Sequence, residues 1–339
     1  MKHFYPLQTL ICFLWLSCLP CFTQNTSVIY IENGNTEVGI LSEVGGRIVV
    51  LRKTGQDNLL KATSELWEEP LSERPVPDAN HPSMKSYFGQ IVWVGPQADW
   101  WVQQNLNKRL RDAAAPWPPD PFLIYGDYRI IHRTDSSIVI SGPESSVSGM
   151  QLVKEVVIDR SGRVHFKVTG KNISRQDIAW DLWCNLRMPG LTRCYVPVDD
   201  TADVRISFPM GPQFPMPHRL ADGYFSFSVS DTAHVRSTGK AFIYPKAGWM
   251  AGFRDKQVLV IRFPRLAKER IHPDQGHAEI YQDIGPSSAM LLELEHHAAY
   301  QKLEPGETMS TEEVWEVLPC EGANTEASQL QFLKKVFGI

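Results

Sequence analysis

Residues 289–318 contain the pattern that most constrains the fold of this chain. From residue 289 to 295 the side chains alternate with the two-residue period of a β-strand, which places Glu293 and Glu295 together on one face. Pro305 and Gly306 predict a turn, and the alternation returns over residues 309–317. The sequence therefore predicts a β-hairpin with two carboxylates on one face of its first strand.

Short runs of the same kind recur along most of the chain and are separated by Asn, Asp, Gly and Pro residues. They cover residues 28–32, 37–41, 47–52, 91–94, 128–132, 137–141, 151–159, 164–169, 178–188, 193–198, 204–208, 223–229, 241–244, 249–253, 258–263 and 278–283. Residues 64–122 are instead rich in Trp, Pro and Glu, with one brief helix expected over residues 100–113. Residues 326–336 predict an amphipathic helix. We predict an all-β, large antiparallel sandwich that forms one domain over residues 24–339, with irregular Trp- and Pro-rich loops and a C-terminal helix.

The N-terminus has the features of a secretory signal peptide. Lys2 precedes an apolar run over residues 7–22 that is too short for a convincing membrane span, and we expect cleavage near residues 23–24. The sequence thus predicts a signal peptide over residues 1–23 and an exported protein, periplasmic or extracellular. Lipid anchoring through Cys18 is a less favoured alternative, and no later segment is apolar enough to span a bilayer.

Charge and cysteine content exclude several classes of function. With 34 basic and 38 acidic residues, the chain has no electrostatic footprint for nucleic acid. After the leader only Cys184, Cys194 and Cys320 remain, without the paired spacing of a zinc site. Cys184 and Cys194 could form a disulfide or stay as buried thiols. Since no phosphate-binding loop or nucleophile elbow is present, we expect neither a metal nor a cofactor. The sequence leaves the oligomeric state open.

The paired carboxylates are the first candidates for chemistry. Like charges at neighbouring same-face positions repel, so Glu293 and Glu295 require a solvated surface, a cation or a ligand-lined cleft. Proton transfer at a sugar ring needs a carboxylate and a second proton-handling group. His296 adjoins the carboxylates and is our candidate for that group, with His297, His272, His277 and His218 as alternatives. An acidic, exposed strand edge is the structural alternative.

Several further residue types are suited to binding a sugar. Indoles on irregular segments can stack on pyranose rings or pack as a small core, and we expect one or two of them in each role. Polar side chains on the strand over residues 178–188 share a face, which is typical of a cleft-lining strand. Guanidinium and ammonium groups could bind a uronate or a sulfate, or form surface ion pairs. The candidate substrate-binding residues are Arg47, Trp93, Gln97, Trp100, Trp101, Trp117, Asn185, Arg187 and Lys246.

Short motifs over residues 28–318 resemble the galactose-mutarotase-like β-supersandwich superfamily. GGRIVVL with DNLL is similar to its first meander, KVTGKNIS before IAWDLW to a strand that ends in an Asn-x-Ser turn, and LELEHH with LEPGETMSTEEVWEV to its closing hairpin. The WVGPQADWW and PWPPD segments resemble a secreted bacterial branch. The resemblance implies that Glu293 lies nearest the mutarotase base. The Asn-Arg-His and His-x-Tyr-Phe-Asn settings of the mutarotase histidines are absent here.

The sequence therefore predicts an exported protein that acts on a mono- or oligosaccharide through a cleft carboxylate. Epimerase (mutarotase-like), lyase and glycosidase activities are all compatible with the resemblance. A non-catalytic carbohydrate-binding protein is the alternative, and the two are distinguished by whether a His or a second carboxylate lies near Glu293 in one cleft.

Overall fold

The computed structural model describes Met1 and residues 28–228, 235–322 and 324–337. Apart from Met1, the predicted signal peptide and its cysteines lie outside the described residues. Among the helices of the described part, none is long and apolar enough to cross a membrane. Cys184, Cys194 and Cys320 are buried free thiols, so the disulfide alternative for Cys184 and Cys194 is wrong.

The described strands form two antiparallel sheets of ten strands each. In spatial order, the first sheet consists of β1 (Ile29–Asn33), β2 (Thr36–Leu41), β3 (Arg47–Lys53), β4 (Gln90–Gly95), β9 (Ile178–Pro189), β18 (Leu291–His297), β17 (Ala278–Ile284), β14 (Ser237–Ile243) and β11 (Val204–Ser207). A short strand, β19 (Gln301–Leu303), pairs with the start of β9. The second sheet consists of β12 (His218–Ala221), β13 (Tyr224–Phe227), β10 (Arg193–Pro197), β15 (Trp249–Arg254), β16 (Gln257–Arg262), β20 (Thr308–Pro319), β8 (Val164–Asn172), β7 (Met150–Ile158), β6 (Ser137–Glu144) and β5 (Arg129–Arg133).

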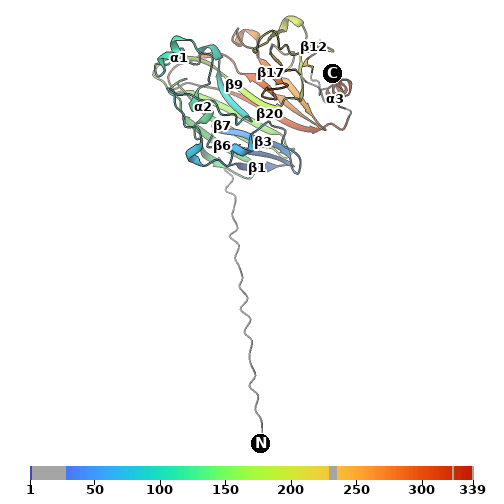
Figure 1. Ribbon diagram of the computed structural model, residues 1–339, viewed down its shortest axis with the longest axis horizontal. Helices are drawn as coiled ribbons and strands as arrows, with labels where there is room; N and C mark the ends of the chain where they lie inside the picture. Colours follow the sequence, from blue (N-terminus) through green and yellow to red (C-terminus); the bar gives the residue numbers. More distant parts are fainter. Residues whose placement is uncertain (2–27, 229–234, 323, 338–339) are drawn as a thin grey trace.

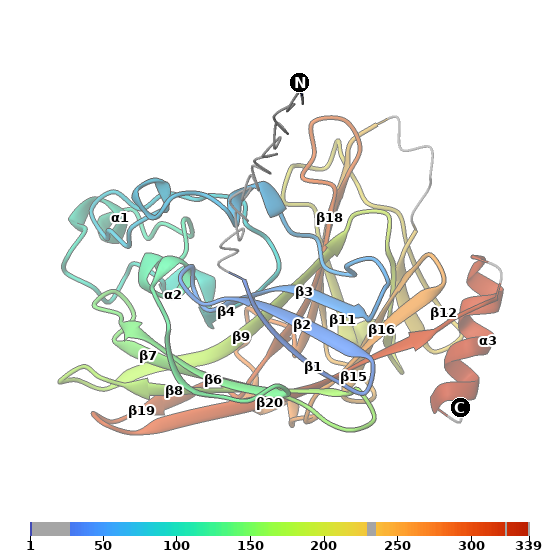
Figure 2. The same ribbon diagram turned by 90° about the horizontal axis from the view of Figure 1, so that it is seen from below.

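The two sheets pack face to face around the main hydrophobic core. Figure 2 shows β1 to β4 and β9 lying over β6, β7, β8 and β20. The core-facing positions of β9 alternate with polar positions, so Leu182 and Leu186 are buried between the sheets while Arg187 points to the opposite face. This confirms the predicted all-β sandwich.

The helices lie at the ends of the sandwich. The short helices α1 (Lys108–Asp112) and α2 (Pro121–Tyr125) lie at one end, and α3 (Glu326–Phe337) lies at the other (Figure 1). Helix α3 confirms the predicted C-terminal helix. It covers the outer face of β10, β15 and β16, where Leu333 is buried and the rings of Trp249 and Phe337 stack with centroids 3.7 Å apart. Because both faces of the second sheet are buried there, Val258 to Ile261 form a continuous apolar run.

The helix expected over residues 100–113 is shorter than predicted. It begins only at Lys108, where the Asn107 side chain accepts a hydrogen bond from the Leu110 N–H and caps the helix. The preceding indoles instead stabilise an irregular segment. Trp100 Nε1 donates to the Val94 carbonyl at 2.5 Å, and Trp101 Nε1 donates to the Pro118 carbonyl at 2.7 Å.

The hairpin predicted for residues 289–318 is wrong, although both of its strands exist. Strand β18 pairs with β17 and β9 in the first sheet, whereas β20 pairs with β16 and β8 in the second. The turn at Pro305 and Gly306 follows β19 and carries the chain from one sheet to the other, and Gly306 has the positive φ of 85° that the turn requires. The two strands therefore contribute side chains to the core from opposite sides.

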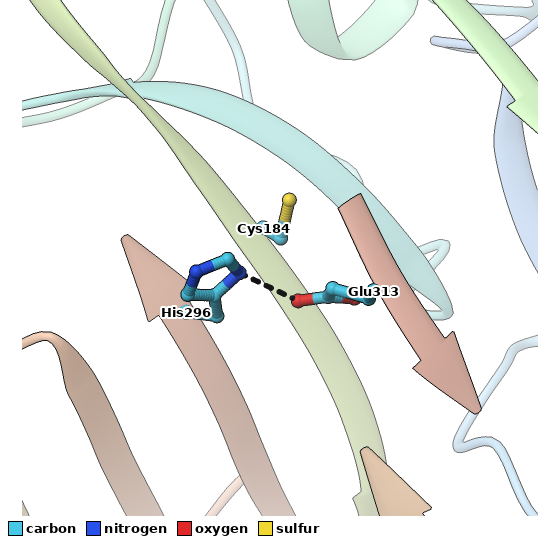
Figure 3. A group of neighbouring side chains, drawn as sticks. All are labelled: Cys184, His296 and Glu313. Carbon is cyan, nitrogen blue, oxygen red and sulfur yellow. Dashed lines mark hydrogen bonds and ion pairs between the residues drawn. The ribbon is translucent and has the colours of Figure 1, made fainter. Parts of the chain in front are cut away.

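A buried polar group joins the two sheets. His296 of β18 and Glu313 of β20 point toward one another, beside Cys184 of β9 (Figure 3). His296 Nδ1 lies 3.2 Å from Glu313 Oε1, and Trp315 Nε1 donates to Glu313 Oε2 at 2.8 Å. Glu313 is thus a buried carboxylate on an otherwise apolar face, and both of its oxygens have partners.

We expect Glu313→Ala to lower the free energy of unfolding by about 3 kcal/mol, because it leaves the buried His296 and Trp315 donors without an acceptor. Urea unfolding followed by tryptophan fluorescence measures this change. The matched control is Glu312→Ala, the exposed neighbour on the same strand, which we expect to shift stability by less than about 0.5 kcal/mol. Equal effects of the two substitutions would contradict a structural role for Glu313.

Candidate functional site

A pocket of about 890 Å³ lies on the face of the first sheet that points away from the second sheet. Seven neighbouring strands form its floor: β3, β4, β9, β18, β17, β14 and β11. Its rim comes from irregular segments around residues 84–88, 96–98, 116–117, 209–210 and 274–275. Three of these five segments belong to the Trp- and Pro-rich region over residues 64–122 that the sequence marks as irregular.

The strand register places the floor side chains in two rows. In the first row Lys240 pairs with Tyr281, Tyr281 with Glu293, and Glu293 with Arg187. In the second row Phe242 pairs with Glu279, Glu279 with Glu295, and Glu295 with Asn185. Directly opposed side chains in antiparallel strands lie about 5 Å apart at Cβ, so three carboxylates from two strands converge on one area of the floor.

Lys240 forms ion pairs with two of these carboxylates. Its Nζ atom lies 2.7 Å from Glu279 Oε2 and 2.7 Å from Glu295 Oε2. Glu295 Oε2 also accepts a hydrogen bond from Trp183 Nε1 at 2.7 Å. The Lys240 side chain is 13% exposed, whereas the side chains of Glu279 and Glu295 are 2% and 0% exposed.

The protonation of the group follows from burial and neighbouring charges. Burial raises the pKa of Glu295 to about 7, against the opposing effect of the Lys240 ammonium. The pKa of Glu279 is lowered in spite of its burial, because Lys240 and His297 both stabilise its ionised form. Two carboxylates on one floor therefore differ in how readily they bind a proton, which is an arrangement suited to acid–base chemistry.

His297 lies beneath the same group. Its Nδ1 atom is 3.2 Å from Asp181 Oδ1, and its Nε2 atom is 3.4 Å from Glu279 Oε1. Burial alone would lower the pKa of His297, but the two carboxylates outweigh it and raise the pKa to about 10. The imidazolium is fully buried, so it supports the floor and does not itself face the pocket.

Glu293 is the floor carboxylate that a ligand can reach. Its side chain is 13% exposed and lines the pocket, and its Oε1 atom accepts a hydrogen bond from Arg187 Nε at 2.7 Å. Arg187 Nη1 has no hydrogen-bond acceptor among the described residues, and its guanidinium lies 5.2 Å from the centre of the Trp93 ring. The ion pair holds Glu293 in place at the centre of the floor.

Indoles form one wall of the pocket. Trp93, Trp117 and Trp183 line it, and the rings of Trp93 and Trp117 meet edge to face with centroids 6.4 Å apart. Trp117 is 47% exposed, so its ring is accessible to a ligand. Trp100 and Trp101, also predicted to bind substrate, are buried by their backbone hydrogen bonds and belong to the core instead.

Most of the other predicted binding residues also lie at the pocket, but one lies elsewhere. Arg47, Gln97 and Arg187 line the pocket, and Asn185 lies in the floor with both amide atoms buried and without partners among the described residues. Lys246 does not belong here, since it is not among the lining residues and pairs with Asp199 at 2.7 Å on the exposed surface.

Two of the three predicted catalytic residues lie at the pocket, and the third does not. Glu293 lines the pocket, Glu295 lies immediately below it, and His296 points to the opposite face of β18 (Figure 3). The assignment of His296 to the site is therefore corrected, because the two-residue period of the strand directs it into the inter-sheet core. The same period directs His297 to the face of Glu293 and Glu295.

Five further residues line the pocket without being indicated by the sequence patterns: Lys240, Glu279, Tyr281, Gln275 and Arg205. For two of these residues the sequence does contain a pattern that indicates a shared face. Glu279 and Tyr281 occupy alternate positions of β17, in the same way as the carboxylates of β18. The strand expected from the sequence begins at residue 241 and therefore leaves out Lys240. The position of Lys240 beside the carboxylates is set by strand pairing.

Among the residues that the structure describes, two groups of side chains have the spacing to hold a metal ion. In the first, Glu279, Glu295 and His297, the Lys240 ammonium already lies at ion-pairing distance from both carboxylates and supplies the positive charge. The second consists of Cys184, His296 and Glu313, and none of these lines the pocket. Neither group is needed as a metal site to explain the pocket.

The chain belongs to a family described as a domain of unknown function (DUF4380), whose model matches residues 27–318. Comparison with the curated proteins found no match.

Solved structures show that the fold is galactose mutarotase-like. A galactose mutarotase-like protein from Lactobacillus casei is 11% identical, with a TM-score of 0.57 over 86% of this chain and 100% of that one. A galactose mutarotase related enzyme from Lactobacillus acidophilus is also 11% identical, with a TM-score of 0.50 over 88% and 100%. A TPR-domain containing protein from Parabacteroides distasonis is 15% identical, with a TM-score of 0.52 over 88% of this chain and 48% of that one. The fold expected from the sequence motifs is thus confirmed.

We expect the stability contributed by His297 to depend on pH in a defined window. Its raised pKa means that the contribution is complete below about pH 6.5 and is lost as the pH rises toward 10. The difference in unfolding free energy between the wild type and His297→Gln should therefore shrink over this window. Unfolding at a series of pH values measures it.

The control substitution is His132→Gln on the exposed strand β5. For this variant the difference in unfolding free energy from the wild type should not change over the same pH window. A His297→Gln difference that is equally constant between pH 6.5 and 10 would show that the imidazole is not held charged by Asp181 and Glu279.

Proposed function

We propose that the protein binds a sugar unit in this pocket and acts at the sugar ring, with Glu293 as the proton acceptor. One observation carries the proposal: an accessible carboxylate lies at the centre of a polar floor, beside an exposed indole wall, on a galactose mutarotase-like fold. Apolar sugar faces pack on indoles, and carboxylates and amides bind hydroxyl groups, so the lining matches the chemistry of a sugar.

The proposed step is proton transfer at the anomeric centre. Glu293 would accept the proton of the anomeric hydroxyl while the bond from the anomeric carbon to the ring oxygen breaks and the ring oxygen receives a proton. Reclosure on the other face of the resulting aldehyde reverses both transfers and gives the other anomer.

Tyr281 is the proposed donor to the ring oxygen. It stands opposite Glu293 in the strand register and lines the pocket, and burial raises the pKa of its phenol, which keeps it protonated. The reaction then needs no histidine, in agreement with the absence of the mutarotase histidine motifs and with the place of His296 outside the pocket.

A specific observation also favours non-catalytic sugar binding as a second candidate. Arg187 holds Glu293, and Lys240 holds Glu279 and Glu295, so each floor carboxylate already has a cationic partner. These ion pairs hold the carboxylates in fixed positions, where they can accept hydrogen bonds from sugar hydroxyl groups without any proton transfer. The two candidates differ in whether bound sugar is converted.

The first test is the substitution Glu293→Gln, which keeps the shape of the side chain but removes its capacity to accept a proton. We expect the rate of anomer interconversion, followed by NMR exchange or polarimetry on a panel of monosaccharides, to fall by roughly 100-fold or more while binding is retained. Glu65→Gln, at an exposed position outside the pocket, is the control and should leave the rate unchanged.

Retention of the full rate in Glu293→Gln would exclude Glu293 as the proton acceptor. A wild-type protein that binds sugar without converting it would support the second candidate.

The indole wall gives an independent test of binding. Trp117→Ala should weaken sugar affinity roughly tenfold, because an accessible stacking surface is lost, whereas Trp117→Phe should retain most of the affinity. Calorimetric titration measures both. Since Trp117 is half-exposed, neither substitution should lower the melting temperature strongly. Unchanged affinity in Trp117→Ala would place the sugar elsewhere.

A further inference from the structure

The end of the pocket formed by β3 and β9 contains a buried positive charge without a counter-charge. Arg47, at the start of β3, is 1% exposed and lines the pocket. Its Nη1 atom donates to the Phe88 carbonyl at 2.8 Å and its Nη2 atom to the Ile124 carbonyl at 3.1 Å. Both acceptors are neutral, and no carboxylate forms an ion pair with Arg47 within the described ranges of the chain.

Arg187 adds a second guanidinium to the same end. It is 3% exposed, and its charge is, after burial, the main cause that lowers the pKa of Arg47 to about 9. Within the described part of the chain, its one carboxylate partner is Glu293. Two cations therefore share one anion, and a net positive charge remains because Arg47 is still protonated at neutral pH.

A buried positive charge of this kind destabilises the folded protein unless an anion balances it. An ion buried without a partner loses its hydration, and a like charge nearby adds repulsion. In addition, Arg47 Nε and Arg187 Nη1 have no hydrogen-bond acceptor among the residues described. The two side chains thus lack an anion that could complete their hydrogen bonds and balance their charge.

The opposite end of the pocket is different. Lys240 on β14 has two carboxylates, and the Arg205 guanidinium on β11 lies 3.7 Å from the centre of the Phe242 ring and donates to the Asp274 carbonyl at 2.6 Å. In the sheet order, four strands lie between β3 and β14, and five lie between β3 and β11. The unbalanced buried charge is therefore confined to the end with Arg47.

We propose that the sugar bound in this pocket carries an anionic group, a carboxylate or a sulfate or phosphate ester, and that Arg47 and Arg187 bind that group. The inference rests on the proposed sugar-binding function and specifies its ligand class. The anion would balance the Arg47 charge, while the neutral part of the ring lies over Glu293 and against Trp93 and Trp117.

The test compares matched neutral and acidic sugars by calorimetric titration of the full chain. The pairs are glucose with glucuronate and galactose with galacturonate, and glucose 6-phosphate and glucose 6-sulfate distinguish the kind of anion. We expect at least one acidic sugar to bind roughly tenfold more tightly than its neutral counterpart, with the difference decreasing as salt is raised.

Substitutions then locate the anion. Arg47→Gln should abolish the preference for the acidic sugar, whereas the matched control Arg205→Gln, at the other end of the same pocket, should keep it. If Arg47→Gln fails to fold, Arg187→Lys provides the second variant, because it keeps the charge but removes the planar fork and should reduce the preference.

The outcomes separate this inference from the proposed function. Equal affinity for neutral and acidic sugars would overturn the inference and leave sugar binding intact. A preference that is lost in Arg205→Gln and kept in Arg47→Gln would overturn the location of the anion. Binding of no sugar, acidic or neutral, would overturn both the inference and the proposed function.

Discussion

The ion pairs of Lys240 are the interaction on which the pocket depends. Glu279 and Glu295 face each other across β17 and β18, and two ionised carboxylates in that position would repel strongly at low exposure. The ammonium between them, at 2.7 Å from each, turns this repulsion into attraction. A continuous antiparallel sheet can therefore present an acidic face without exposing it fully to water. Glu293 is then left as the carboxylate that faces the pocket.

Support for this arrangement comes from deeper in the sheet. Asp181 and Glu279 hold His297 charged beneath the floor, and Trp183 donates a hydrogen bond to Glu295. On the other face of the same strands, His296 and Glu313 join the two sheets through the core (Figure 3). Strand β18 thus contributes polar side chains to both of its faces, with different partners on each.

Much of the fold could be predicted from the sequence, because strand alternation is a local property. The pairs Glu293 with Glu295 and Leu292 with Leu294 lie on the faces that the two-residue period requires. The hairpin was wrong because strand pairing is not local: β18 and β20 are close in sequence but join different sheets, and their partners come from residues 164–189 and 257–284. Motif resemblance indicated the supersandwich fold, but it also described residues 289–318 as a closing hairpin and so did not correct the pairing.

The candidate site was predicted only in part, for a related reason. Glu293, Arg47, Arg187, Trp93 and Trp117 were identified by residue type and by the strand or loop that holds them. The ion pair of Lys240 and Glu279 could not be predicted from residue type. It depends on the distance between the two side chains, which is set by the pairing of β14 with β17. Of the two adjacent histidines, the two-residue period places His297, and not His296, on the side of the carboxylates.

The central claim is that the pocket on the outer face of the first sheet binds a sugar over Glu293. A crystal structure of the protein soaked with the tightest-binding sugar tests this claim most directly. The account predicts a sugar ring against Trp93 and Trp117, with one hydroxyl within hydrogen-bond distance of the Glu293 carboxylate. A sugar bound only outside this pocket, or an empty pocket at a saturating concentration, would contradict it.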